Sequence, residues 1–137
     1  MTSAAVLGAA LGMLVNSLFV GWVAVSLRGL TPDLEAVRRR FFPGATLTAL
    51  MLGITGASLL FWPAVGAIYG VGYGLWRAAG PQFGLGSPHW PFSLLVTASA
   101  FGLFGRFLLR AETRLTTAVW VGLYSGIFGW LLPWFVE

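Results

Sequence analysis

Four long apolar stretches constrain the fold of this chain more than any other feature of its sequence. They run from about residue 3 to 27, from 45 to 76, from 91 to 109 and from 115 to 136. About 20 helical residues, each rising about 1.5 Å, cross a hydrocarbon core of about 30 Å. The first, third and fourth stretches each match one crossing, and the second exceeds it. The sequence therefore predicts an all-α, polytopic integral membrane protein.

The composition supports the same fold class. Charged residues make up 9% of the chain and hydrophobic residues 58%, whereas a soluble domain carries about 25% charged residues. The formal net charge is +4, but the arginines lie in short segments between apolar stretches, which is typical of membrane-protein loops and not of a nucleic-acid-binding face. The chain has no Cys, which excludes disulfides and thiolate metal sites.

Pro63 interrupts the second stretch, and proline removes a backbone donor and crowds the preceding turn. We therefore expect a kink or break there, a crossing that ends at residue 62, and an interfacial or extension segment over residues 63–80 that does not cross. The predicted domain is a single transmembrane unit with four crossings. They lie at about residues 3–27, 45–62, 91–110 and 115–135, joined by a cytoplasmic loop at 28–43 and an outer loop at 81–90.

Arginines set the predicted orientation, because short Arg-rich loops stay cytoplasmic. One loop carries Arg28 and residues 38–40, and the other carries Arg106, Arg110 and Arg114. Both lie on one side only if residues 63–80 do not cross. Both termini are then non-cytoplasmic, in a bacterial inner membrane or in a photosynthetic or other energy-transducing membrane. Trp22 and Trp120 are expected near the inner headgroups, and the outer level is expected to hold Trp62, Trp76, Trp90, Trp130 and Trp134.

The first of these loops has the pattern of a short amphipathic helix. Thr31, Pro32 and Asp33 suit its beginning, and a run of three arginines suits its negative end. The run consists of Arg38, Arg39 and Arg40, which we expect to contact anionic lipid or a partner protein. The alternative is that these arginines only fix the topology.

Small residues spaced four apart recur along every apolar stretch. In lipid, helix association depends on close packing, which small residues permit. These faces are predicted helix-packing sites, either inside the chain's own bundle or against partner subunits. They consist of Gly8 and Gly12, then Gly66, Gly70 and Gly74, then Ala98 and Gly102, then Gly122 and Gly126. Asn16 is assigned to the same packing role, as an interhelical hydrogen-bonding group or alternatively a ligand for an ion or cofactor.

An aromatic face near the outer interface is the candidate site for a lipid or cofactor. Tyr69, Tyr73 and Trp76 share this face with Arg77, and His89 and Trp90 follow in the outer loop. Such a face suits a lipid, quinone, carotenoid or chlorophyll, although nothing in the sequence requires a cofactor; the alternative is an interfacial aromatic belt. A single His without Cys or a nearby carboxylate makes a poor metal site, so no metal is expected.

The sequence carries no pattern of a catalytic site, such as a Ser–His–Asp set, paired carboxylates or a phosphate-binding loop. No carboxylate or Lys lies inside a predicted crossing, although ion-coupled carriers generally need one. We therefore expect a non-enzymatic accessory subunit of a multi-subunit membrane complex, whose partners are other membrane subunits and lipids. The alternatives are a small homo-oligomeric channel or transporter, and an assembly factor for a membrane complex.

Overall fold

The computed structural model describes residues 2–28, 39–40, 42–84, 88–108 and 114–137. Its main helices are α1 (Thr2–Arg28), α3 (Leu47–Ala79), α4 (His89–Leu108) and α5 (Arg114–Tyr124). A 3₁₀ turn, η1 (Gly80–Phe83), follows α3, and α5 continues through the π-helical segment η2 (Ser125–Leu131) into α6 (Leu132–Val136). The predicted all-α class is confirmed.

Three of the described helical stretches are long and apolar enough to cross a membrane. They are Thr2–Val25, Leu47–Phe83 and Arg114–Val136. This length and hydropathy agree with an integral membrane location. The remaining predicted crossing, at residues 91–110, corresponds to α4, which has 20 residues and runs beside α5.

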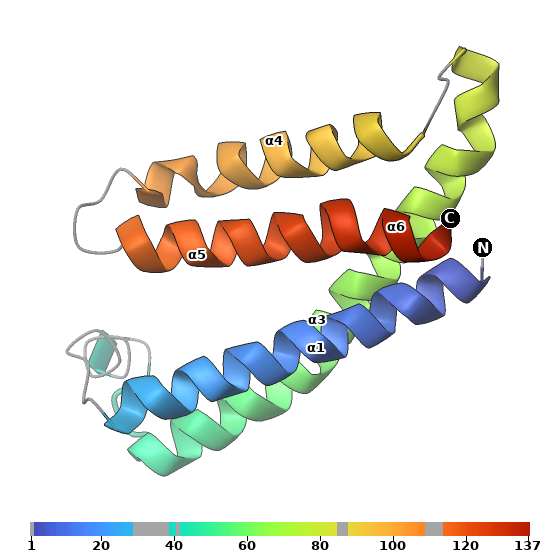
Figure 1. Cartoon of the computed structure of the whole chain (residues 1–137). Coiled ribbons are helices and arrows are strands. Elements are labelled where there is room, and N and C mark those ends of the chain that lie inside the picture. The colour runs from blue at the N-terminus through green and yellow to red at the C-terminus, as the bar shows by residue number, and fades with distance from the viewer. Residues whose placement is uncertain (1, 29–38, 41, 85–87, 109–113) are drawn as a thin grey trace.

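The helices form two antiparallel hairpins, α1 with α3 and α4 with α5–α6 (Figure 1). The start of α1 and the end of α6 lie at one end of the molecule, and the end of α1, the start of α3, the end of α4 and the start of α5 lie at the other (Figure 1). The hairpins meet where α6 and η2 pack on α1. From there α1 and α5 diverge toward this second end (Figure 1).

The hydrophobic core therefore occupies the half of the molecule near the termini. It combines residues from α1, α3, α4, η2 and α6. These residues are Leu11, Val15, Tyr73, Phe92, Val96, Ile127, Phe128 and Leu132. Tyr73, Phe128 and Leu132 have no exposed surface at all. Many other large apolar side chains face outward, such as Leu60 at 78% exposure and Leu103 at 71%, which suits helices surrounded by lipid.

Pro63 lies inside α3 and does not end it. The helix begins after Thr46, whose hydroxyl accepts a hydrogen bond from the Ala49 amide at 3.2 Å, and it continues for 33 residues to Ala79. Residues 63–79 therefore extend the second predicted crossing as one helix. A break would leave several backbone groups without partners in lipid, whereas proline removes only one donor from a continuing helix.

Pro133 explains the change of helix type near the C-terminal end of α5. Proline has no N–H to donate to the carbonyl four residues earlier, which belongs to Gly129. The Ser93 hydroxyl of α4 donates to this carbonyl at 2.6 Å instead. The neighbouring Leu132 amide donates to the Ile127 carbonyl, five residues back. The chain thus keeps its buried carbonyls hydrogen-bonded through the wider turns of η2.

The structure tests the two loop predictions only in part. Most of the loop with the predicted amphipathic helix, including Arg38, lies outside the described residues; Arg39 and Arg40 are helical and exposed. At the other end of the molecule, α4 begins at His89, so this residue occupies the first turn of a helix and not the outer loop. Pro91 is accommodated because first-turn amides need no helical acceptor.

Candidate functional site

The closest packing in the molecule is a seam of small residues between α1 and α3, which we call the glycine seam. It consists of Ala4, Gly8 and Gly12 on α1 and of Gly66 and Gly70 on α3. A Cβ atom built on Gly8 would lie 2.0 Å from the Gly66 carbonyl oxygen, and one on Gly70 would lie 2.0 Å from that of Ala4. Only glycine permits this approach of two helix backbones.

The register of the glycine seam shows how far α1 covers α3. Residue 4 lies opposite residue 70, residue 8 opposite 66, and Gly12 opposite Trp62 and Pro63. The part of α3 after Pro63 therefore packs against the first third of α1. Only the turns after Gly70 extend beyond the seam, and Gly74, in the first of them, is half-buried.

The small residues of the other hairpin are placed differently. Ala98 and Gly102 of α4 are exposed, and so is Gly122 of α5. A Cβ atom added to Gly102, Gly122 or Gly126 would meet nothing within 4 Å. The close approach between α4 and η2 uses Gly129 instead, whose added Cβ would lie 3.2 Å from Val96. The four-residue spacing of Gly and Ala does not predict Gly129, because the residues four positions before and after it are Ser125 and Pro133.

Most of the polar groups of the predicted aromatic face bond to the chain itself. The Tyr73 hydroxyl donates to Glu137 Oε1 at 2.9 Å, and Arg77 Nη1 donates to the Val136 carbonyl at 2.9 Å. His89 Nδ1 lies 3.3 Å from Glu137 Oε2. Together these contacts link α3 and α4 to the end of α6 and to Glu137. Sequence reasoning missed Glu137, the residue that Tyr73 and His89 share, because nothing in its neighbourhood marks it.

The other aromatic residues of this set have similar roles. Trp76 Nε1 donates to the Pro88 carbonyl at 2.9 Å, which ties the end of α3 to the start of α4. The Tyr124 hydroxyl donates to the Tyr69 hydroxyl at 2.6 Å between the two hairpins. Trp90 is 60% exposed and packs edge-on against Trp130, with ring centroids 5.1 Å apart. The structure therefore brings these residues together as ties between helices.

Asn16 is buried, with 5% of its surface exposed. Its Oδ1 atom has no hydrogen-bond partner among the described residues. Four hydroxyls bond to the backbone of their own helical segment. They are Ser17, Ser58, Thr97 and Ser125, each of which donates to a carbonyl three or four residues earlier.

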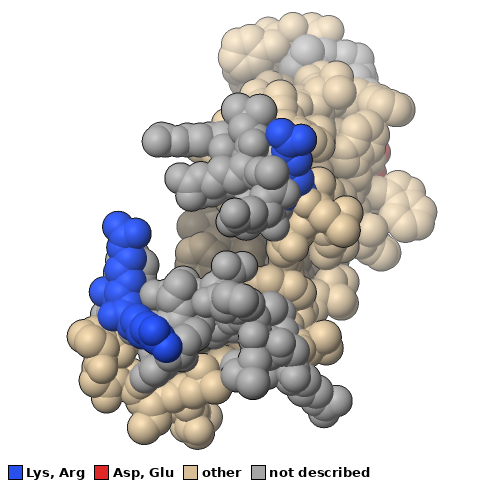
Figure 2. All heavy atoms as spheres, turned by 90° about the vertical axis from the view of Figure 1, so that its left-hand side faces the viewer, with Lys and Arg blue, Asp and Glu red and all other residues tan. Residues whose placement is uncertain are grey.

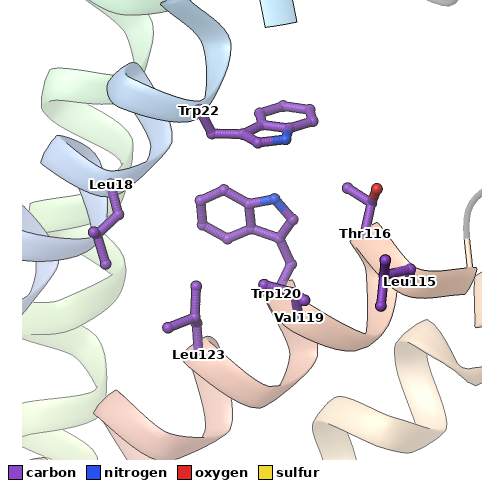
Figure 3. Close-up of a pocket in the computed structure, with 7 residues that line it drawn as sticks. All are labelled: Leu18, Trp22, Leu115, Thr116, Val119, Trp120 and Leu123. Carbon is purple, nitrogen blue, oxygen red and sulfur yellow. The ribbon is translucent and has the colours of Figure 1, made fainter. Parts of the chain in front are cut away.

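Between the diverging hairpins lies a hollow that the sequence did not predict, which we call the aromatic cleft. It comprises two adjoining cavities that share Trp22 of α1 and Trp120 of α5. The first, of about 320 Å³, is shown in Figure 3 and is lined by Leu18, Trp22, Leu115, Thr116, Val119, Trp120 and Leu123. The second, of about 200 Å³, is lined by Phe19, Trp22, Trp62, Phe104, Thr117, Trp120, Val121 and Tyr124.

Trp62 lines the aromatic cleft beside Trp120, although the sequence predicts these two residues at opposite headgroup levels. Its indole stacks on that of Trp120, with centroids 6.4 Å apart and planes 14° from parallel. Phe19 contacts both rings, at centroid distances of 6.0 Å to Trp62 and 5.8 Å to Trp120. Because the two indoles are in contact, Trp62 and Trp120 cannot lie at opposite levels, and Trp62 lies inside α3 because this helix continues through Pro63.

Charge is concentrated at the end of the molecule toward which the hairpins diverge. The exposed arginines described there are Arg39 and Arg40, shortly before α3, and Arg114, at the start of α5. Figure 2 looks onto this end and shows arginine atoms on both sides of a recess. Among the described residues, no group of three or more His, Cys, Asp and Glu side chains is placed to hold a metal ion.

Comparison of the chain with protein-family models, with curated proteins and with solved structures gives no match.

Proposed function

We propose that this protein is a non-catalytic accessory subunit of a multi-subunit membrane complex, held there by the exposed small-residue face of its second hairpin. The observation that carries the proposal is the contrast between the glycines that the four-residue spacing marks on the two hairpins. Gly8, Gly12, Gly66 and Gly70 are buried against the chain itself, whereas Gly102, Gly122 and Gly126 have open space where a Cβ would stand. Because small residues on lipid-facing helices allow another helix to approach closely, the second face suits a partner subunit.

The internal hydrogen bonds support a structural role over a transport or catalytic one. Tyr73, Arg77, Ser93 and Trp76 all bond within the chain. In the described part of the chain these four polar groups are therefore engaged by the protein itself and not by a substrate path. The proposed topology has four crossings, with the arginine-bearing connections in the cytoplasm and both termini outside, since short arginine-rich loops remain on the cytoplasmic side. Bound lipid, quinone, carotenoid or chlorophyll is compatible with such a subunit.

The test compares copurification of three forms of the tagged chain from its own membranes in a mild detergent. The wild-type chain is expected to elute with other membrane polypeptides in fixed proportion on a native gel. Gly126→Leu should lose these polypeptides, because its side chain has room in the chain itself but would obstruct a docked helix. Gly21→Leu is the matched control, since an added Cβ at Gly21, as at Gly126, meets nothing within 4 Å, and it should copurify like the wild type.

The outcomes separate the proposal from its alternatives. A wild-type chain that purifies as a homo-oligomer would refute the accessory role and favour the small channel or transporter. Association with assembly intermediates, and not with a finished complex, would favour an assembly factor. Equal copurification of Gly126→Leu and Gly21→Leu would show that the glycine face does not hold the partner.

A further inference from the structure

We infer that the aromatic cleft binds one anionic phospholipid, with an acyl chain between the hairpins and the phosphate near the arginines at its rim. The inference is independent of the proposed accessory role, because it concerns a surface other than the open glycine face. It rests on the chemistry of the cleft lining, on the depth of its indoles below the arginines, and on the charge at its mouth.

The lining of the cleft selects an apolar occupant. Leu18 and Leu123 lie on one side of the paired indoles of Trp22 and Trp120, whose centroids are 5.8 Å apart, and Leu115 lies on the other side (Figure 3). The larger cavity, of about 320 Å³, falls within the range of about 300–1,000 Å³ for small-molecule sites. Apolar cavities do not hold water, so a cleft that opens between membrane helices is filled by hydrocarbon.

The depth of the indoles suits the linkage between an acyl chain and its headgroup. Trp120 lies six residues after Arg114 in α5, which corresponds to about 9 Å along a helix. The indole nitrogens of Trp22 and Trp120 lie on the side of the cleft nearer Thr116 (Figure 3). Tryptophan prefers this level of a membrane because its ring is apolar and its N–H takes a polar partner.

The charge at the mouth of the cleft selects an anionic headgroup. Arg39 and Arg40 lie next to the first hairpin, and Arg114 lies at the start of the second hairpin. The recess in Figure 2 therefore has cations on both sides. Each of these arginines also interacts within the chain, but a guanidinium has five N–H donors and can serve a phosphate as well. A zwitterionic lipid would gain less from this arrangement, because its own cation opposes the arginines.

The first test is native mass spectrometry of the delipidated protein with added dioleoyl phosphatidylglycerol or dioleoyl phosphatidylcholine, which have the same acyl chains. One phosphatidylglycerol should bind in preference to phosphatidylcholine. The triple variant Arg39→Gln, Arg40→Gln, Arg114→Gln should lose this preference, by about fivefold for each arginine removed. The matched control Arg77→Gln, at the opposite end of the molecule, should retain it.

The second test locates the acyl chain by fluorescence. One equivalent of phosphatidylglycerol with brominated acyl chains should quench part of the tryptophan emission in detergent. Trp120→Phe should reduce the quenched fraction and Trp134→Phe should not, because Trp134 is exposed and lies outside the cleft. Val119→Trp should fill the larger cavity and reduce the binding of both lipids, whereas Leu103→Trp, an exposed position on α4, should not.

The inference is overturned if the two lipids bind equally to the wild type, or if Arg77→Gln weakens phosphatidylglycerol binding as much as the triple variant does. It is also overturned if the Trp120→Phe and Trp134→Phe variants are quenched alike. A doubled protein mass that excludes lipid would instead assign the cleft to a second copy of this chain.

Discussion

Gly8→Ala tests the physical basis of the α1–α3 hairpin. The added methyl carbon would lie 2.0 Å from the Gly66 carbonyl oxygen, whereas ordinary contact begins at about 3.4 Å. The helices must therefore separate by about 1.4 Å, because both atoms belong to backbones that cannot turn aside. Overpacking usually costs about 1–3 kcal/mol, and we expect about 3 kcal/mol here, because separation also loosens the contacts at Gly12 and Gly70.

The assay is unfolding in mixed micelles with increasing dodecyl sulfate, followed by the near-UV and far-UV circular dichroism of the purified chain. Gly21→Ala is the matched control in the same helix, since a Cβ there meets nothing within 4 Å, and it should unfold at or above the wild-type midpoint. If Gly8→Ala and Gly21→Ala unfold together, the glycine seam does not determine the stability of the hairpin and the reasoning fails.

Three further predictions concern buried polarity and topology. Ser93→Ala should lower the unfolding free energy by about 1–2 kcal/mol in the same assay, because it leaves the buried Gly129 carbonyl without a donor; an unchanged midpoint would contradict this. Asn16→Leu should unfold no earlier than the wild type, since Oδ1 has no partner among the described residues; a large loss would reveal a bond to another group. Single cysteines replacing Arg39 and Phe83 should react with an impermeant maleimide from opposite faces of the membrane, and labelling from one face would refute the proposed topology.

The pattern of apolar residues along the chain is enough to predict the fold class and much of the helix layout. Apolar stretches about 20 residues long predicted four helices, and the helix ends lie close to the predicted ends for α1 and for α5 with α6. These features are local: hydrophobicity and backbone hydrogen bonding force a helix on any apolar stretch in lipid, whatever its neighbours are. The four-residue spacing of small residues is also a local feature, and it predicted Gly8, Gly12, Gly66 and Gly70 as helix-packing residues.

The sequence does not show which of the glycines at four-residue spacing face another helix of the chain; this follows from the packing of the helices. The four-residue spacing is the same at Gly8 and at Gly122, yet the first is buried against α3 and the second is exposed, because the pairing depends on how the hairpins meet. The effect of Pro63 is not predictable from the sequence either, because its missing donor permits a break or a continuous helix. In the structure α3 is continuous, and the residues on both sides of Pro63 pack along α1 in the glycine seam. Glu137 contacts residues that are far from it in the sequence, and the aromatic cleft is lined by residues from distant segments. Local sequence patterns do not predict such contacts between helices.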